Sequence, residues 1–371
     1  MSRKTLAYVV ALLAVASHNV MADAGKTLKA GNEYLIVANY PNNLHVIDMQ
    51  NDTLYKSCEM PGEFGPGLVQ MSPDRKIAYV LNNHFADVYG IELDTCKPVF
   101  HARLAQKFGE NARSFLSMTV SHDGREIYTV ANPTKVFTDH YEVQQPRLQV
   151  YAASGGMNAK PIRTFPAPRQ MTLMQGGVDG SLYVLGPDLY KVDTKTGKFN
   201  VILPLRNSKR PNYSPPDVLY AWGHQTYRRD FSFLQTAMKF KDGNQDPAAG
   251  EIVYGYSSVD LTNGKTETAD FLSPVTEVYF SGMRSPKDPN LMFTVLNHLS
   301  KFDIKQQKLI KSAALDHSYY CVTLNKAGSK VYLTGTFNDV AIYDADSMER
   351  IGGLKLPGGD MALNTAQAFI R

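Results

Sequence analysis

Short apolar runs alternate with polar, turn-forming residues along almost the whole chain. In the clearest repeats, a tight turn is followed by an aromatic residue in a run of alternating aromatic and β-branched side chains. These segments are MSPDRKIAYVLNN (71–83), VSHDGREIYTVAN (120–132), GGVDGSLYVLGPD (176–188) and LNKAGSKVYLTGT (324–336). A turn followed by such an alternation is typical of a β-hairpin. The pattern therefore predicts strands joined by short turns.

A second signature is an apolar strand that ends in an aspartate and precedes a short polar turn. Its copies are LHVIDMQNDT (44–53), YKVDTKTGKF (190–199), SSVDLTNGKT (257–266), SKFDIKQQKL (300–309) and VAIYDADSME (340–349). The aspartates are Asp48, Asp193, Asp260, Asp303 and Asp344. Aspartate commonly accepts backbone N–H bonds at hairpin turns, and one active site cannot use five equivalent acids. We expect a structural role for all five.

Together the two signatures define a unit of four strands, named a to d from the inside outward. Copies of this unit cover residues 66–104, 112–166, 168–205, 216–273, 275–314 and 317–356. Residues 33–60 supply only strands b, c and d, whereas GDMALNTAQAFIR at the C-terminus supplies a lone strand a. The two ends therefore complete a seventh unit, which two β-sandwiches would not explain. The sequence predicts an all-β fold, a seven-bladed β-propeller over residues 23–371, whose ring is closed by the C-terminal strand pairing with the N-terminal blade.

Two of the predicted blades carry insertions between strands b and c. They are PTKVFTDHYEVQQP (133–146) and KFKDGNQDPAAG (239–250). In a propeller these loops lie on the same face as the d–a connections. An insertion there is either a tolerated surface loop or a segment that grips a partner, and both readings stay open.

The N-terminus predicts export from the cytoplasm. Arg3 and Lys4 precede an apolar run of a dozen residues, and Val20 and Ala22 form a small-residue cleavage signal. This order indicates a signal peptide over residues 1–22 rather than a membrane anchor, because the apolar run is shorter than the ~20 residues that span a bilayer. We expect a soluble periplasmic protein without a membrane partner.

Charge and cysteine content exclude several classes of function. Loss of the two basic residues in 1–22 lowers the formal net charge from +4 to +2, and no basic run is interleaved with aromatic residues, so nucleic acid is not expected as a partner. The sequence has no C-x-x-C-H, C-x-x-C or H-E-x-x-H motif, so neither attached haem nor metal is predicted. Cys58 and Cys96 fall at peripheral positions of adjacent blades, where a disulfide is conceivable, and Cys321 is expected to be a buried thiol.

The repeat resembles the YVTN family of periplasmic propellers. The resemblance rests on residues 72–75 with 79–82 and on residues 122–124 with 128–132, which match that family's turn and strand motifs. Such a motif indicates the fold and gives little information on function.

Residues ~31–371 also resemble the propeller subunit of quinohaemoprotein amine dehydrogenases. The resemblance implies a periplasmic heterotrimer that oxidatively deaminates primary amines. A small subunit would carry cysteine tryptophylquinone, and a dihaem cytochrome c subunit would carry the electrons onward through haem c. This chain would be a scaffold that binds no cofactor itself. Trp222 is its only tryptophan and has no neighbouring cysteine, so we interpret it as a packing residue rather than a quinone precursor.

The candidate site residues gather at the ends of strands b and in the d–a connections. The polar candidates after strands b are Asn82, His84, Asn297 and His298, and those in the d–a connections are Phe115, Asp316, His317 and Tyr319. Histidine titrates near neutral pH, and aromatic side chains at a channel mouth suit an apolar amine or a hydrophobic partner. The same residue types also form turns and pack inner strands, so a structural role stays open for each.

Three classes of function remain. The first is a scaffold subunit of an amine dehydrogenase, with no catalytic centre wholly within this chain. The second is a stand-alone periplasmic YVTN-type propeller that binds a ligand or a protein. A self-sufficient enzyme such as a lactonase is the third, although the carboxylate and asparagine metal cage that it requires is not evident. A scaffold should expose a large apolar patch on the mouth side, which distinguishes it from a monomeric binding module.

Overall fold

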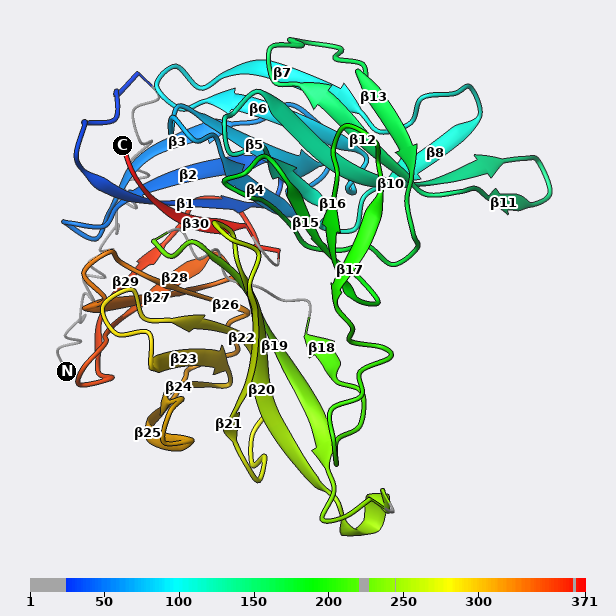
Figure 1. Ribbon diagram of the computed structural model, residues 1–371. Helices are drawn as coiled ribbons and strands as arrows, with labels where there is room; N and C mark the ends of the chain where they lie inside the picture. Colours follow the sequence, from blue (N-terminus) through cyan, green and yellow to red (C-terminus); the bar gives the residue numbers. More distant parts are fainter. Residues whose placement is uncertain (1–24, 220–226, 244, 363–364) are drawn as a thin grey trace, which may run out of the picture.

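The computed structural model describes residues 25–219, 227–243, 245–362 and 365–371, so the predicted signal peptide and Trp222 lie outside the described residues. Its strands form seven antiparallel sheets, which are the blades of a β-propeller (Figure 1). The inner strands of neighbouring blades contact one another around the axis, as β4 does with β9 and β30. The predicted all-β, seven-bladed fold is confirmed.

The strands of each blade are given from the inside outward. Blade 1 contains β30 (Ala366–Ile370), β1 (Glu33–Asn39), β2 (Asn43–Asp48) and β3 (Thr53–Glu59). Blade 2 contains β4 (Leu68–Met71), β5 (Ile77–Asn82), β6 (Asp87–Glu92) and β7 (Lys97–Arg103). Blade 3 contains β9 (Met118–Val120), β10 (Glu126–Val136), β12 (Arg147–Ala152) and β13 (Arg163–Pro166), and β8 (Glu110–Arg113) and β11 (Tyr141–Val143) pair with the far end of β10. Blade 4 contains β14 (Met174–Gly176), β15 (Leu182–Leu185), β16 (Leu189–Val192) and β17 (Phe199–Leu203).

The remaining three blades follow the same order. Blade 5 contains β18 (Asp217–Leu219), β19 (Asp230–Lys239), β20 (Glu251–Asp260) and β21 (Thr266–Leu272), with the 3₁₀ helix η1 (Pro247–Ala249) between β19 and β20. Blade 6 contains β22 (Tyr279–Arg284), β23 (Leu291–Leu296), β24 (His298–Asp303) and β25 (Lys308–Ala314). Blade 7 contains β26 (Cys321–Leu324), β27 (Lys330–Thr334), β28 (Asp339–Asp344) and β29 (Arg350–Lys355).

Blade 1 closes the ring as the sequence predicts. Strand β30 pairs antiparallel with β1, with Tyr34 opposite Phe369 and Ile36 opposite Gln367. The ladder continues beyond the strands, where the Gly31 N–H donates to the Arg371 carbonyl at 2.8 Å. The Arg371 guanidinium also pairs with Asp94, which follows β6 of blade 2. Closure therefore removes the exposed edges that an open sheet would leave.

The repeated tyrosines are among the largest buried side chains of the core. Tyr79, Tyr128, Tyr183 and Tyr332 are all buried, on strands β5, β10, β15 and β27. Where a hydroxyl is buried it needs a partner, and the Tyr332 hydroxyl donates to Asp52 at 2.6 Å. Burying such a ring contributes on the order of 2 kcal/mol each, which explains why the repeat retains an aromatic residue at this position.

The five repeated aspartates have the predicted structural role. Each carboxylate accepts a backbone N–H from the turn that follows it. For example, Asp193 accepts from Lys195 at 2.8 Å, and Asp344 accepts from Ser347 at 2.7 Å. These backbone bonds hold the pKa of both carboxyls below its usual value. The aspartates fix the turns between strands c and d.

A disulfide joins Cys58 of β3 to Cys96 in the turn between β6 and β7. Their Cα atoms lie 5.2 Å apart, a normal separation for such a bond. The predicted pairing across adjacent blades is confirmed. Cys321 is buried on β26 and takes no part in this disulfide.

Both predicted insertions project from the ring. Strand β10 continues past blade 3 and forms an arm with β8 and β11, and β19 and β20 continue past blade 5 toward η1 (Figure 1). The arm carries exposed side chains, including Phe137, Tyr141 and Val143. The structure leaves the apolar tip of the arm open to solvent.

His45 is a buried pH-sensitive group in the closing blade. It lies on β2, where its Nδ1 is 2.8 Å from the Ser57 hydroxyl and its Nε2 is 3.1 Å from both the Asn39 side-chain oxygen and the Pro357 carbonyl. Burial lowers its pKa to about 4, and the hydrogen bond to Pro357 offsets this only in part. The imidazole is therefore neutral in the folded protein at neutral pH.

This burial predicts an acid-dependent loss of stability. Between pH ~6.5 and pH ~4 the unfolded chain protonates His45 while the folded chain does not, so the free energy of unfolding should fall by roughly 3 kcal/mol across that window and by no more below it. Urea unfolding at pH 7, 5.5 and 4.5 measures the loss. In His45→Gln, the fall in the free energy of unfolding between pH ~6.5 and pH ~4 should be smaller by roughly 3 kcal/mol, because the titrating group is absent. Parallel curves for the two proteins would contradict the assignment.

Candidate functional site

The antiparallel order of the blades gives the propeller two functionally distinct faces. Strands b and c are connected on the same face as the d–a connections, which we call the mouth-side face. The a–b and c–d turns lie on the opposite face, which we call the turn-side face. Every candidate site residue predicted from the sequence belongs to the mouth-side face, or to a strand end that adjoins it.

One group of candidates converges between blades 6 and 7. The Asn297 side-chain oxygen accepts a hydrogen bond from the Ser318 hydroxyl at 2.6 Å. Next to it, His317 Nε2 lies 3.1 and 3.2 Å from the two Asp339 carboxylate oxygens, and its Nδ1 lies 2.9 Å from the Ser318 carbonyl. Both ring nitrogens thus lie within hydrogen-bond distance of acceptor oxygens.

Tyr319 completes this group, which we call the His–Asp–Tyr cluster. Its hydroxyl donates to Asp339 at 2.5 Å, and its ring centroid lies 4.2 Å from that of His317. Burial, followed by the nearby Asp339 carboxylate, raises the pKa of the Tyr319 phenol, so it stays protonated and keeps donating. Phe337 covers His317 at 4.8 Å and is itself 50% exposed. The cluster therefore combines a half-buried carboxylate with an apolar wall.

A second group forms a row of aromatic side chains over blades 1 to 3. Phe64 stacks on His84 at 4.1 Å and contacts Tyr40 at 5.7 Å. The row continues from His84 to its chain neighbour Phe85, which packs edge-on against Phe115 at 6.3 Å. Phe64 is 44% exposed and Phe115 is 52% exposed. We call Tyr40, Phe64, His84, Phe85 and Phe115 the aromatic row.

The remaining candidates make local contacts. Asn82 is buried, and its amide donates to the Pro61 carbonyl at 3.0 Å, so it supports the loop beneath the aromatic row. His298 Nδ1 lies 3.4 Å from a carboxylate oxygen of Glu277. Asp316 pairs with Arg350 at the outer edge of blade 7. The candidates thus form two groups on one face, one between blades 6 and 7 and the other over blades 1 to 3.

Sequence reasoning missed Asp339, Phe337 and Phe64. Asp339 begins β28, just after a loop whose sequence, GTFND, reads as an ordinary turn. Its relation to His317 depends on how the d–a connection before β26 lies against the start of β28, rather than on spacing along the chain. Phe64 could have been found from its place in a d–a connection, where an aromatic residue in a Gly-rich loop has little core to join.

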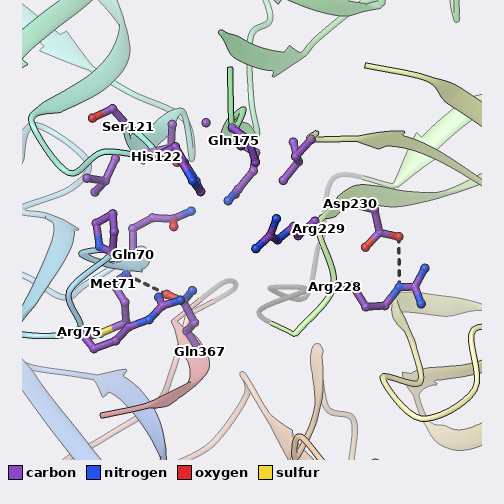
Figure 2. Close-up of a pocket in the computed structure, with 16 residues that line it drawn as sticks. Gln70, Met71, Arg75, Ser121, His122, Gln175, Arg228, Arg229, Asp230 and Gln367 are labelled. Atoms are coloured by element: carbon purple, nitrogen blue, oxygen red, sulfur yellow. Dashed lines mark hydrogen bonds and ion pairs between the residues drawn. The ribbon is translucent and has the colours of Figure 1, made fainter. Parts of the chain in front are cut away.

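A polar cavity of about 370 Å³ lies at the opposite end of the axis, on the turn-side face. Gln70, His122, Gln175 and Arg229 extend toward the same central space (Figure 2). The sequence analysis did not predict this cavity. Its signal was a glutamine at matching positions of three inner strands, in LVQM (68–71), MQG (174–176) and AQAFI (366–370).

Metal-binding groups and membrane-crossing helices are both absent from the described ranges. There, no group of three or more histidine, cysteine, aspartate or glutamate side chains is placed to hold a metal ion. Across those same ranges, no helix is long and apolar enough to cross a membrane.

No protein-family model matches the chain, and no curated protein matches it in sequence. Solved structures do resemble it. Hydrazine synthase of Kuenenia stuttgartiensis has a TM-score of 0.52 at 11% identity, covering 85% of this chain and 90% of that one. Dihydro-heme d1 dehydrogenase NirN has a TM-score of 0.52 at 14% identity, covering 93% and 76%.

A protein of unknown function from Desulfotomaculum acetoxidans has a TM-score of 0.54 at 12% identity, covering 90% of this chain and 99% of that one. Likeness at such low identity carries the fold and no activity. The seven sheets of the chain and its likeness to these solved structures agree that it folds as a seven-bladed β-propeller.

Proposed function

We propose that this chain is the scaffold subunit of a periplasmic, heterotrimeric quinohaemoprotein amine dehydrogenase, and that its mouth-side face receives the small quinone-bearing subunit. The aromatic row is the observation that carries this proposal. Contiguous exposed aromatic residues are uncommon on a monomer and enriched at the centres of protein interfaces. Phe64, Phe115 and, across blade 1, Phe337 supply such a surface.

The His–Asp–Tyr cluster is suited to a primary amine held at that interface. The Asp339 carboxylate can accept a hydrogen bond from an ammonium group, and the exposed Phe337 ring offers an apolar wall and a cation–π contact. His317 can hold a proton at Nε2 next to that carboxylate. The quinone of the small subunit would supply the oxidising chemistry, and the haem c groups of the cytochrome subunit would take the electrons. This chain's residues would orient the amine and exclude water.

Isolation of the assembled complex tests the proposal directly. The protein is purified from the periplasm of its source organism grown on a primary amine, and its absorption spectrum and denaturing gel are recorded before and after phenylhydrazine. Haem bands, a co-purifying small chain that takes the hydrazine label, and amine-dependent haem reduction are expected. A colourless single chain that does not react with hydrazine and is stable alone would refute the assignment.

Substitutions in the aromatic row should weaken partner binding. Phe64→Ser and Phe115→Ser each remove an exposed ring, and central aromatic residues of interfaces often contribute ~2 kcal/mol, which corresponds to a roughly thirtyfold loss of affinity. Affinity for the small subunit is measured by titration of the separated subunits. Val201→Ser on β17 is the matched control, because Val201 is 50% exposed on an outer strand and should leave the affinity unchanged. Equal affinities for all three variants would place the interface elsewhere.

A stand-alone periplasmic YVTN-type binding propeller is the second candidate, and the turn-side cavity favours it. That cavity is polar, concave and formed by this chain without a partner. Ligand binding to a stable monomer, with no co-purifying chains, would support this candidate over the scaffold.

A further inference from the structure

The turn-side cavity is lined by basic side chains from three blades. Arg75 comes from the β4–β5 turn of blade 2, and Arg228 and Arg229 precede β19 of blade 5. His122 from the β9–β10 turn of blade 3 adds an imidazole (Figure 2). Arg75 and the two arginines of blade 5 are more than 150 positions apart in sequence, and the ring of blades brings them around one opening.

The positive charge of this cavity is not balanced by the protein. Asp230 is the acidic residue among the described lining, and it is already paired with Arg284 and with Arg228 Nε at 3.3 Å. In the described part of the chain, neither the Arg75 nor the Arg229 guanidinium forms a salt bridge or hydrogen bond with another residue. Among the residues that the structure describes, these two guanidinium groups are therefore available to a ligand.

Arg75 is held in place by its turn. Its backbone has a φ of 61°, its N–H donates to the Ser72 carbonyl at 2.9 Å, and its own carbonyl accepts from Arg371 at 2.6 Å. The neighbouring Asp74 carboxylate is engaged by the Ser72 hydroxyl at 2.6 Å and the Lys76 N–H at 3.1 Å. Burial lowers the pKa of Arg75, which means that its charge is poorly solvated where it stands. An anion in the cavity would offset that loss of solvation.

Amide groups line the wall between the cations. Gln70, Gln175 and Gln367 occupy matching positions on the inner strands β4, β14 and β30. The Gln367 oxygen is held by the Met71 N–H at 2.8 Å, which leaves its NH₂ group to donate elsewhere. The Gln175 oxygen is buried and has no hydrogen-bond partner in the described residues. That oxygen is an acceptor, so water or another donor would satisfy it, and only the NH₂ groups of the three glutamines can contact an oxyanion.

We propose that the turn-side cavity binds a small, multiply charged oxyanion, either inorganic phosphate or a di- or tricarboxylate. Arg75 and Arg229 would form charge-assisted hydrogen bonds to its oxygens, and the glutamine amides would contact the remaining oxygens. A volume of about 370 Å³ is at the small end of ligand sites and suits such a molecule. The site lies on the face opposite the aromatic row, so it does not depend on the proposed scaffold role.

Calorimetric titration of the purified chain with sodium phosphate and, separately, with sodium citrate tests this proposal, at an ionic strength held constant with sodium chloride. Saturable one-to-one binding in either arm is expected, and the arm that binds identifies the ligand as inorganic or organic. Arg229→Gln and Arg75→Gln should each weaken binding at least tenfold. Arg125→Gln is the matched control, because Arg125 is on the same face, 84% exposed and outside the cavity, and it should bind within twofold of the unchanged protein.

Thermal unfolding without ligand establishes that the variants are folded. Because Arg229 is exposed, its variant decides the result even if Arg75→Gln is destabilised. Absence of saturable binding in both arms would overturn the proposal. Equal weakening by Arg229→Gln and Arg125→Gln would also overturn it, since that result describes diffuse attraction to a basic face.

Discussion

Replacing both Cys58 and Cys96 by serine is expected to lower the free energy of unfolding by ~4 kcal/mol. The two cysteines are 38 residues apart in sequence, and the bond between them restricts the unfolded chain over that whole loop. In the folded protein it links the outer strand of blade 1 to the outer hairpin of blade 2, so it also holds the closing blade to its neighbour. Urea unfolding of the oxidised protein and of the double variant measures the difference.

Reduction supplies the control for this experiment. Dithiothreitol should shift the unfolding midpoint of the unchanged protein to that of the double variant and should leave the double variant unaffected. Cys321 is present in both proteins, so any effect of dithiothreitol on this thiol is the same in both and does not contribute to the difference between them. A difference below about 1 kcal/mol would mean that packing between blades 1 and 2 fixes this loop without the bond.

Asp230→Asn should produce a loss of comparable size, about 3 kcal/mol. Asp230 on β19 pairs with Arg284 on β22, and both side chains are buried between blades 5 and 6. Asparagine preserves the shape but leaves the Arg284 cation buried next to a neutral partner. Glu267, 3.5 Å from the other end of the guanidinium, is half exposed and compensates only in part. Chemical denaturation at pH 7 measures the loss.

The double variant Asp230→Asn, Arg284→Met distinguishes the loss of an ion pair from a general disturbance of packing. Removing the cation as well should recover stability relative to Asp230→Asn, since no unpaired charge is then buried. The losses in the free energy of unfolding for Asp230→Asn and for Arg284→Met are added and compared with the loss in the double variant. If the double variant loses more than this sum, the ion pair is not what stabilises this interface. The anion site can be assayed in the same proteins, because Asp230 itself faces that cavity.

The fold was predictable because its determinants repeat locally. A turn followed by a buried tyrosine recurs around the ring, and so does an aspartate at the end of the next strand that accepts N–H bonds from the turn after it. Because the pattern recurs, an error in reading one copy is corrected by the others. Ring closure was predictable for a related reason, since a strand missing at residue 33 reappears at residue 366. Placing two cysteines at the edges of adjacent blades made a disulfide conceivable, and the structure supplies the bond itself.

The sites were less predictable because their residues meet only in three dimensions. His317 and Tyr319 were candidates, but they lie in the connection before β26, whereas their partner Asp339 begins β28 within an ordinary turn sequence. The turn-side cavity was missed because Arg75 and Arg229 are separated by more than 150 positions, and each alone reads as a surface arginine. They are brought together only because the blades are arranged around a common axis. The alternation of residues along a strand predicts which face of the sheet a side chain occupies, but it does not predict which distant loop that side chain contacts.

Closure by the last strand also sets the order in which the protein can mature. Strand β1 is synthesised early, yet its inner edge cannot be covered until β30 has been made, at the other end of the sequence. Until then the growing chain carries an unpaired strand edge, and the contact that covers it is among the most distant that the chain can form. An open strand edge can pair with other chains. Ring closure within one chain therefore competes with association between chains during folding. The blade that makes the finished ring resistant to aggregation is therefore the one that leaves the unfinished ring most vulnerable to it.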